Sequence, residues 1–218
     1  MLDYSKVVHN ILSFPMSCSS GSVVTLTECA SIASGSKSAR FFFNKNEHLC
    51  YWSCVFLSNG TCTMLCISPW SAYEVKWKKN SALRKPTIGS SVHEGNYRNW
   101  DPHFATDGFV QNGGTQIFHS TFEHYPWIWI DLLETLSISF IRIYNRRDGG
   151  GQRFHDVAVE VTNNSVYVQR GFYKGPAVTG EIVDILCDYP AIARYVRLRI
   201  TEGSGNSLNI PELEIYTT

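Results

Sequence analysis

The sequence predicts a mainly β protein in which a small disulfide-rich α+β domain precedes a larger β-sandwich. Three observations predict this class. Six of the seven cysteines lie within the first 66 residues, short β-rich segments fill the remainder of the chain, and no long amphipathic helical pattern occurs. Hydrophobic residues make up 44% of the 218 residues and charged residues only 17%, a composition that supports packed cores rather than disorder.

The clustered cysteines indicate a disulfide framework in the first third of the chain. They are Cys18, Cys29, Cys50, Cys54, Cys62 and Cys66. Six cysteines allow 15 pairings, which sequence alone does not resolve. The spacings Cys50-x3-Cys54 and Cys62-x3-Cys66 also suit zinc ligands, but the residues inside them are bulky rather than turn-forming. Dense cysteine is typical of secreted proteins, so we favour disulfides over zinc and expect an extracellular location.

Two further features bear on the location of the protein. Asn59-Gly60-Thr61 and Asn163-Asn164-Ser165 are acceptor sequences for N-glycosylation, in agreement with secretion. Residues 1–6 lack the charged-then-apolar layout of a signal peptide. Either the natural chain begins upstream, which we favour, or the protein is cytosolic and its thiols are reduced.

Residues 1–78 are expected to place one helix on a small sheet. Thr25 and Glu28 have the spacing of a capping box, so a helix is predicted to begin there. Two short aromatic segments, 41–43 and 49–52, favour strands, and the segment 73–77 closes this region. The Leu-x-x-Cys start of the helix, the aromatic strand and the closing segment together resemble a PAN/apple module. The resemblance implies a cysteine-rich PAN/apple-like domain over 1–78.

The second domain, 88–218, is predicted to consist almost entirely of strands. A basic segment that contains a proline, 79–87, is expected to link it to the first domain. Gly, Asn, Asp and Pro turns separate the predicted strands, which are 127–132, 137–144, 157–161, 165–168, 182–186, 195–200 and 213–216. Within 195–200, apolar residues alternate with two arginines, the period-two pattern of a half-buried strand. Many short strands without long helices predict a β-sandwich.

One loop of this domain, 145–153, concentrates chemistry that suits a ligand. It holds three arginines, one aspartate and three glycines. Arginine presents a rigid fork of donors, and glycine lets a ligand approach the backbone closely. Two forks suit a ligand rich in acceptors, such as a phosphate, a carboxylate or the hydroxyls of a sugar. Asp148 would orient a guanidinium and reduce the local charge, which favours a neutral ligand; the alternative is a solvated charged turn.

Together with a preceding histidine, this loop matches a family motif. The spacing His119-x26-Arg146-x-Asp148-x4-Arg153 agrees at every specified position with the motif of F-type lectins, or fucolectins. Neighbouring segments also resemble that family: 105–108, 126–132, 193–196 and 211–216. The resemblance covers 88–218 and places this region near the discoidin, or coagulation factor V/VIII type C, superfamily. It implies that the β-sandwich is a jelly roll.

The resemblance also implies a function. His119, Arg146 and Arg153, with Asp148, would bind terminal L-fucose or a related sugar, so fucosylated or related glycans are the expected partners. The family usually carries two adjacent cysteines as an apolar platform after the aspartate, whereas this chain has Gly149-Gly150. Nearby aromatic residues could replace the platform, and the candidates are Phe118, Phe122 and Tyr97.

A structural calcium ion is a further implication of the resemblance. Asp107 and Glu212 match the two carboxylate ligands of the family, and the backbone carbonyls of Phe104, Phe109 and Gln116 would complete the shell. Calcium takes six to eight oxygen ligands, so this donor set is chemically suitable. The alternative is that Asp107 caps a turn and Glu212 is a surface acid.

Composition and motifs exclude several other classes. The 19 basic and 19 acidic residues give no net charge, which argues against nucleic-acid binding, and no apolar run is long enough for a transmembrane segment. The sequence has no GxSxG or HExxH motif, so we do not expect an enzyme.

The alternative function is a discoidin-type adhesion module that binds protein or lipid head groups through Trp100 and Phe109. Because single sugar sites bind weakly, a homo-oligomer is expected.

Overall fold

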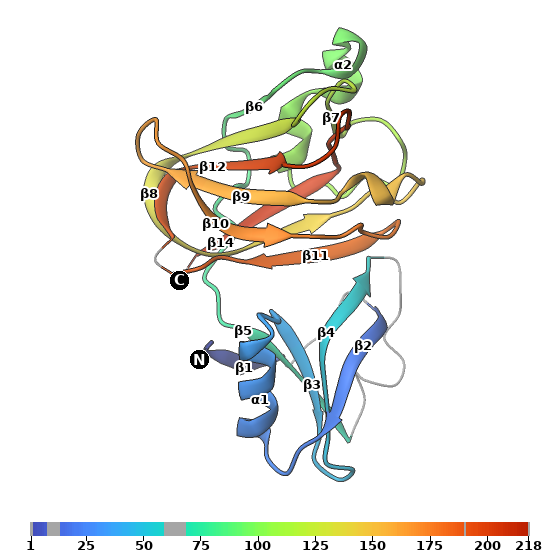
Figure 1. The fold of residues 1–218 in the computed structure, drawn as a ribbon, viewed down its shortest axis with the longest axis vertical. Helices are drawn as coiled ribbons and strands as arrows, with labels where there is room; N and C mark the ends of the chain where they lie inside the picture. Colours follow the sequence, from blue (N-terminus) through green and yellow to red (C-terminus); the bar gives the residue numbers. More distant parts are fainter. Residues whose placement is uncertain (1, 8–13, 59–68, 190, 218) are drawn as a thin grey trace. The chain divides into compact units, whose positions relative to one another are not determined.

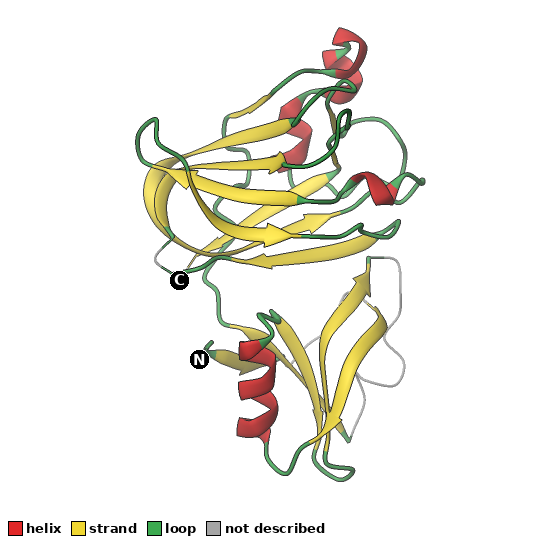
Figure 2. Cartoon of the chain, viewed as in Figure 1, coloured by secondary structure: helices red, strands yellow, loops and turns green. Residues whose placement is uncertain are grey.

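The computed structural model describes residues 2–7, 14–58, 69–189 and 191–217, and it divides the chain into two compact units. The first unit is Met1–Trp77 and the second is Lys78–Thr218. Figure 1 shows the path of the chain, and Figure 2 shows that strands dominate both units. Among the described residues, no helix has the length and apolar character needed to cross a membrane.

The first unit is a single helix with an antiparallel sheet. Helix α1 spans Leu26–Gly35. The strands run β1-β5-β3-β4-β2 across the sheet, and their bounds are Tyr4–Lys6 (β1), Phe14–Ser22 (β2), Arg40–Asn44 (β3), Leu49–Leu57 (β4) and Trp70–Val75 (β5). The helix buries Cys29 and Ala33 in a small core that also holds Phe41 and Phe43. An α+β fold for this unit is confirmed.

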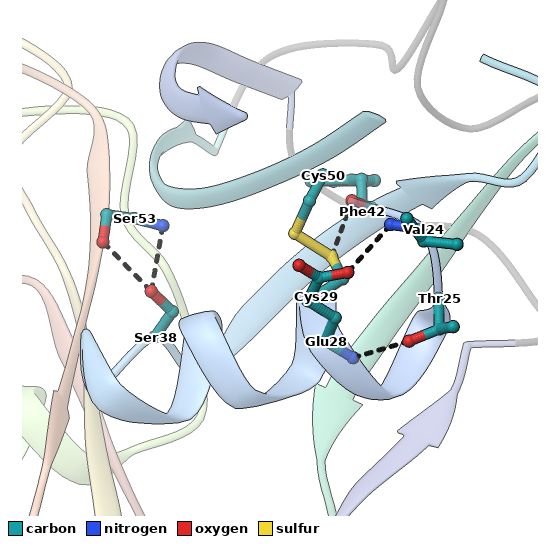
Figure 3. The surroundings of a disulfide bond; sticks show 8 residues. All are labelled: Val24, Thr25, Glu28, Cys29, Ser38, Phe42, Cys50 and Ser53. Carbon is teal, nitrogen blue, oxygen red and sulfur yellow. Dashed lines mark hydrogen bonds between the residues drawn. A yellow bond between two sulfur atoms is a disulfide. The ribbon is translucent and has the colours of Figure 1, made fainter. Parts of the chain in front are cut away.

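Helix α1 begins where the capping box predicts. The side chain of Thr25 accepts a hydrogen bond from the backbone N–H of Glu28 at 3.1 Å, and the carboxylate of Glu28 accepts one from the N–H of Val24 at 2.8 Å (Figure 3). These two bonds satisfy backbone donors that a helix start otherwise leaves unpaired. The sequence signal therefore identified the first residue of the helix correctly.

Four of the clustered cysteines form two disulfides in the first unit. Cys18 pairs with Cys54, and Cys29 pairs with Cys50. The second bond ties α1 to β4 and lies within the small core (Figure 3). The preference for disulfides over zinc is confirmed for these four residues. Cys62, Cys66 and the acceptor sequence at 59–61 lie outside the described residues.

The second unit is a two-layer sandwich that one long strand joins. Strand β8, Trp127–Tyr144, pairs in its first half with β6 and β12 and in its second half with β11 and β14. Strands β9 and β10 extend the layer beyond β12, and β7 pairs separately with β13. The bounds of these strands are Thr87–Gly89 (β6), Phe118–His119 (β7), Val157–Thr162 (β9), Val168–Tyr173 (β10), Glu181–Leu186 (β11), Ile192–Ile200 (β12), Asn209–Ile210 (β13) and Glu212–Thr217 (β14). Figure 1 shows β8 curving between the layers.

Short helices occupy the connections of the second unit rather than its layers. They are η1 (His93–Gly95), α2 (Tyr97–Trp100), η2 (Pro102–Thr106) and η3 (Gly151–Arg153). Each is one turn or slightly longer, and η2 buries Ala105 in the core of the sandwich. The fold class predicted from the sequence, a mainly β protein with a C-terminal β-sandwich, is confirmed.

The core of the sandwich follows the alternation that the sequence shows. Val196, Leu198 and Ile200 on β12 are fully buried between the layers. The two arginines between them, Arg197 and Arg199, point to the other side and bind the carboxylate of Glu160 on β9 at 2.7 and 2.6 Å. A period of two therefore separates the core face of this strand from its polar face.

An ion pair between a buried aspartate and a partly exposed arginine lies at the bend of β8. Both carboxylate oxygens of Asp131 accept from the guanidinium of Arg194 on β12, each at 2.7 Å, and Asp131 also accepts from the N–H of Leu133. Leu133 has a φ of 65°, in the left-handed region, so the chain turns sharply here. The predicted strands 127–132 and 137–144 are consequently one continuous strand that bends, not two strands.

Two other segments differ from their predictions. The expected strand 165–168 is wrong: Asn164 accepts from the N–H of Val166 in a turn, and β10 begins only at Val168. The segment expected as a linker, 79–87, packs on the second unit. Asn80 accepts from the N–H of Ile215 on β14, and Ala82 is fully buried.

Candidate functional site

Strand pairing brings the motif residues of the second unit together. His119 lies on β7, and its register partner on β13 is Asn209. Arg153 is the last residue of η3, and its Nη1 lies 3.4 Å from Nε2 of His119. Arg146 and Asp148 belong to the loop that leaves β8. Residues that are 34 positions apart in the sequence, His119 and Arg153, therefore meet in space.

Asn209 joins the two arginines, and sequence analysis missed it. Its side-chain oxygen accepts from Nη1 of Arg146 at 3.4 Å and from Nη1 of Arg153 at 3.3 Å. Its amide nitrogen donates to Ser207 at 3.2 Å, and the residue is only 2% exposed. The two guanidinium groups are thus held on one buried carbonyl oxygen. Asn209 lies three residues before Glu212, a position that the sequence did single out, but its partnership depends on strand register.

Asp148 orients Arg146. Its two carboxylate oxygens accept from Nε and Nη2 of Arg146 at 3.0 and 2.7 Å, the bidentate geometry that a rigid guanidinium favours. The hydrogen bonds from Arg146 hold the pKa of Asp148 below its usual value, so the carboxylate remains ionised and offsets the charge of Arg146. The expected role of Asp148 as an orienting group agrees with this geometry.

A glycine turn sets the position of Arg153. Gly149 has a φ of 119° and Gly150 a φ of 70°, values that residues with side chains rarely adopt. A Cβ on Gly151 would come within 2.5 Å of the backbone nitrogen of Thr179, so only glycine permits this close approach. The glycines that replace the adjacent cysteines therefore define the loop conformation.

His119 is neutral at physiological pH. Burial is the largest of the effects that lower its pKa to about 4, and the charges of His93, Arg146 and Arg153 act in the same direction. The ring packs against those of His93 and Trp100, with centroid distances of 4.2 and 5.2 Å. A neutral imidazole offers one donor and one acceptor, so this group can pair with a hydroxyl without adding charge beside two guanidiniums.

An open cleft of about 410 Å³ adjoins these groups. It is lined by His93, His119, Phe122, Gln152, Arg153, His155, Gly205, Asn206 and Ser207. Of the three aromatic residues proposed as a platform, Phe122 lines the cleft and is 79% exposed. Phe118 is fully buried, so it cannot contact a ligand, and Tyr97 lies on α2 with its side chain exposed.

The expected calcium ligands Asp107 and Glu212 are close together. Gly108 donates its N–H to Oε2 of Glu212, and Asp107 accepts from the N–H of Phe109 at 2.8 Å. Glu212 is 1% exposed, and its Oε1 has no hydrogen-bond partner among the described residues. Burial, together with the charge of Asp107, raises the pKa of Glu212 to about 9. A buried carboxylate with an orphaned oxygen fits a cation, which would satisfy that oxygen.

The remaining expected calcium ligands are less tightly defined. Phe104 lies in η2 and Phe109 directly follows Gly108, so both belong to the segment that contacts Glu212. Gln116 donates its N–H to the carbonyl of Asn99. Within the described ranges, no group of three or more His, Cys, Asp or Glu side chains gathers around a common point. Backbone carbonyls would therefore have to supply much of the shell.

The aromatic tips of the alternative function differ in their surroundings. Phe109 is 60% exposed. The ring of Trp100 instead packs on His93 and His119, with centroid distances of 5.9 and 5.2 Å. Trp100 is therefore part of the wall beside His119 and not a protruding tip.

Comparisons with known proteins place this geometry in context. The sequence model of the F5/8 type C domain family matches residues 87–213. The fucolectin of Anguilla anguilla is 27% identical over 148 residues, which span 63% of this chain and 90% of the relative. Two solved structures are also similar. A fucose-binding module of Streptococcus pneumoniae has a TM-score of 0.54 and 29% identity, over 64% of this chain and 95% of its own. A mutant of the lectin-binding domain of lectinolysin in complex with Lewis b has a TM-score of 0.56 and 25% identity, over 65% and 97%.

Proposed function

The chain belongs to the F5/8 type C domain family, and from this we propose that residues 88–218 form a carbohydrate-binding lectin domain for terminal L-fucose or a related sugar. The relatives supply the ligand class: a fucolectin, a fucose-binding module and a lectin domain in complex with Lewis b are all similar to this chain. The activity proposed is binding, with no chemical step.

One observation carries the proposal: His119, Arg146 and Arg153 converge, since Arg153 lies against His119 and Asn209 accepts from both arginines. The guanidinium forks supply donors in fixed directions, and the neutral imidazole supplies a donor and an acceptor. Vicinal hydroxyls and a ring oxygen match such a set. A sugar whose hydroxyl points elsewhere would leave a desolvated donor unpaired, which costs about 1–3 kcal/mol. Fixed donors can therefore distinguish an axial hydroxyl from an equatorial one.

A calcium ion is proposed as a structural partner of this domain. Asp107 and Glu212 would hold it, with carbonyl oxygens of Phe104, Phe109 and Gln116 as further ligands. The orphaned, buried oxygen of Glu212 supports this proposal. When bound, the ion would neutralise the two carboxylates and join the segment after η2 to β14. The chain's own contribution there is the bond from the N–H of Gly108 to Glu212.

Three further proposals concern the location of the protein, its assembly and its first unit. Two disulfides support an extracellular location. A monosaccharide site binds weakly, so we propose that a homo-oligomer raises the avidity by about 10²–10⁴ where geometry permits. For residues 1–78, a helix packed on an antiparallel sheet and tied by Cys29–Cys50 supports a PAN/apple-like domain.

A glycan array with the full chain tests the proposed function. We expect signal on glycans with terminal L-fucose and none on anionic liposomes of phosphatidylserine. Signal on the liposomes alone would contradict the lectin assignment and support the adhesion alternative, for which exposed Phe109 would be the contact. Phe109→Ala would then separate the two functions, because it would weaken liposome binding and leave glycan binding unchanged.

A further inference from the structure

The acceptor sequence Asn163-Asn164-Ser165 lies on the surface of the second unit, away from the proposed fucose site. All three residues are exposed, in the loop that joins β9 to β10. Strand β9 separates this loop from the loop of Arg153 (Figure 1), and its six residues span about 20 Å. N-glycosylation acts on asparagines of this sequence in surface loops of secreted proteins. A glycan on Asn163 would therefore leave the fucose site open.

The amide of Asn163 is held in one orientation. Its oxygen accepts from the N–H of Arg194 at 2.8 Å and from the hydroxyl of Thr135 at 3.3 Å. Its nitrogen donates to the carbonyl of Ile192 at 3.1 Å. This nitrogen carries two hydrogens, and within the described ranges only one of them has an acceptor. A sugar that replaces the second hydrogen can therefore be attached while all three hydrogen bonds remain.

Local hydrogen bonds fix the rest of the loop. The hydroxyl of Thr162 accepts from the N–H of Asn164 at 3.0 Å, and the side-chain oxygen of Asn164 accepts from the N–H of Val166 at 2.8 Å. Short polar side chains commonly satisfy the backbone of a turn in this way. The side chain of Asn163 therefore starts from an ordered backbone.

A pocket of about 280 Å³ opens beside Asn163. It is lined by Val161, Thr162, Asn163, Asn164, Val166, Val168, Arg170 and Ile192. Val166 is 68% exposed and Ile192 is 52% exposed, so apolar side chains face the solvent here. Contact with the C–H groups of a sugar would remove part of that apolar surface from water.

Arg170 supplies a polar group of this pocket that lacks a partner. Its Nε is buried and makes no hydrogen bond to any described residue. A buried donor without an acceptor is unfavourable, and nearly all such groups in folded proteins are paired. The acetamido carbonyl of N-acetylglucosamine, the first sugar of an N-linked glycan, is a suitable acceptor. A bare anion could also pair with Arg170, but it would make no apolar contact with Val166 or Ile192.

We propose that Asn163 carries an N-linked glycan and that its first N-acetylglucosamine lies in this pocket, with its acetamido carbonyl at Nε of Arg170. Attachment to Asn163 keeps the sugar beside the pocket, so even a weak contact is populated because it is intramolecular. The modification requires passage through the secretory pathway, as the proposed extracellular location implies. It does not depend on fucose binding by the second unit.

Peptide mass mapping of the secreted chain tests the modification. The full chain is secreted from mammalian cells behind an added signal peptide, and a glycosidase that converts glycosylated asparagine into aspartate marks each occupied site. Mapping resolves Asn163 from the acceptor sequence at 59–61. We expect Asn163 to be occupied in most molecules of the wild type and in none of Ser165→Ala. Ser165→Thr keeps the acceptor sequence, so this matched control should be occupied like the wild type.

Thermal unfolding tests the position of the first sugar. Cells that make only high-mannose glycans allow an endoglycosidase to trim the glycan to a single N-acetylglucosamine. Arg170→Ala is introduced into the trimmed protein and into Ser165→Ala, which carries no sugar on Asn163. We expect Arg170→Ala to lower the melting temperature of the trimmed protein by about 2–4 °C more than that of Ser165→Ala. This is the shift expected when one hydrogen bond is lost from a unit of this size.

Each outcome decides one part of the proposal. An unmodified Asn163 in the secreted wild type would overturn it entirely. An occupied Asn163 with equal effects of Arg170→Ala in the two backgrounds would show that the sugar lies in solvent, and the assignment of the pocket would be wrong. Occupation together with the larger effect in the trimmed protein supports both parts.

Discussion

Two like-charged guanidinium groups approach each other at the candidate site because one amide oxygen lies between them. Asn209 accepts from both Arg146 and Arg153 while it donates to Ser207. Hydrogen bonds to charged donors are worth about 1.5–3 kcal/mol each, so a buried acceptor can offset much of the repulsion. Asn209 therefore fixes the orientation of both guanidinium groups, although it need not contact the ligand itself.

Asn209→Ala is predicted to weaken L-fucose binding by at least about tenfold. Both arginines lose their common acceptor, and the conformational entropy that their side chains gain in the free protein is lost when the sugar binds. Titration calorimetry measures the affinity, and far-UV circular dichroism should show an unchanged β-rich spectrum. Asn209→Asp is the informative companion, since a carboxylate keeps an acceptor for both guanidiniums and should retain more affinity than alanine. Equal affinity of Asn209→Ala and wild type would contradict this role.

The low pKa of His119 predicts how binding responds to pH. With a pKa of about 4 the ring stays neutral between pH 7.5 and about 5.5, where an ordinary histidine would gain a proton. Fucose affinity should therefore change by less than about twofold over that range and fall below pH 4, where a third cation would join the arginines. A loss of affinity centred near pH 6.5 would contradict a neutral, buried His119.

The lowered pKa of His119 also predicts how the free energy of unfolding changes with pH. The pKa in the folded state lies below the unfolded value of about 6.5, so the unfolded chain binds more protons between these values. The contribution of neutral His119 is complete above about pH 6.5 and is lost as pH falls toward 4. Urea unfolding of wild type and His119→Asn should therefore diverge at neutral pH and converge in acid.

Among individual residues, the sequence predicted the members of the motif but not the residues that contact them in the folded chain. The resemblance to the F-type lectin motif brought His119 and Arg153 into one hypothesis, and the structure places a nitrogen of each 3.4 Å apart. His93 and Asn209 were missed because their proximity depends on loop paths and on the register of β7 with β13. Phe118 was a poor platform candidate because it precedes His119 on β7 and alternation turns it into the core.

At the scale of elements, the sequence predicted a boundary correctly where a side chain hydrogen-bonds to the backbone close by in the sequence, as at the start of α1. Thr25→Ala should lower the free energy of opening α1 by about 1 kcal/mol, since it removes the acceptor for the N–H of Glu28. Amide hydrogen exchange of α1 in the full chain measures this change. Thr25→Ser keeps a hydroxyl at the cap and should behave as wild type, and equal loss of protection in both variants would show that the cap is not responsible.

Element boundaries failed where a tertiary contact decides them. Strand β8 continues through a bend because Asp131 binds Arg194 and fixes Leu133 in the left-handed region, and no local signal announces that pair. The segment 165–168 has strand-like residues, yet Asn164 holds it in a turn. Alternation in β12 was reliable because one face of that strand packs in the core and the other binds Glu160.

At the scale of the whole molecule, the two units owe their stability to different sources. The first has a small core tied by disulfides, and the second a large apolar core between two layers. Small cores commonly need such covalent support. In the second unit the segment after η2 contacts β14 through Glu212, so an ion there would stabilise the unit as a whole.

Calcium is predicted to raise the melting temperature of the second unit by about 8 °C when it is present at a hundredfold excess over its Kd. Differential scanning calorimetry of the full chain, with calcium or with EDTA, measures the shift. Glu212→Gln should abolish it, because the amide cannot supply the anionic oxygen. Glu202→Gln, which alters an exposed acid, is the control and should keep it. A shift of the same size in Glu212→Gln would exclude Glu212 as a ligand.

The most direct test of the central claim is calorimetric titration of methyl α-L-fucoside into wild type, Arg146→Ala, Arg153→Ala and Arg147→Ala. Arg147 lies in the same loop but donates to Asn112, so its variant is the matched control. The account predicts binding by wild type and Arg147→Ala, and no detectable heat for the other two variants, whose far-UV spectra stay β-rich. Undiminished fucose binding by Arg146→Ala and Arg153→Ala would contradict it.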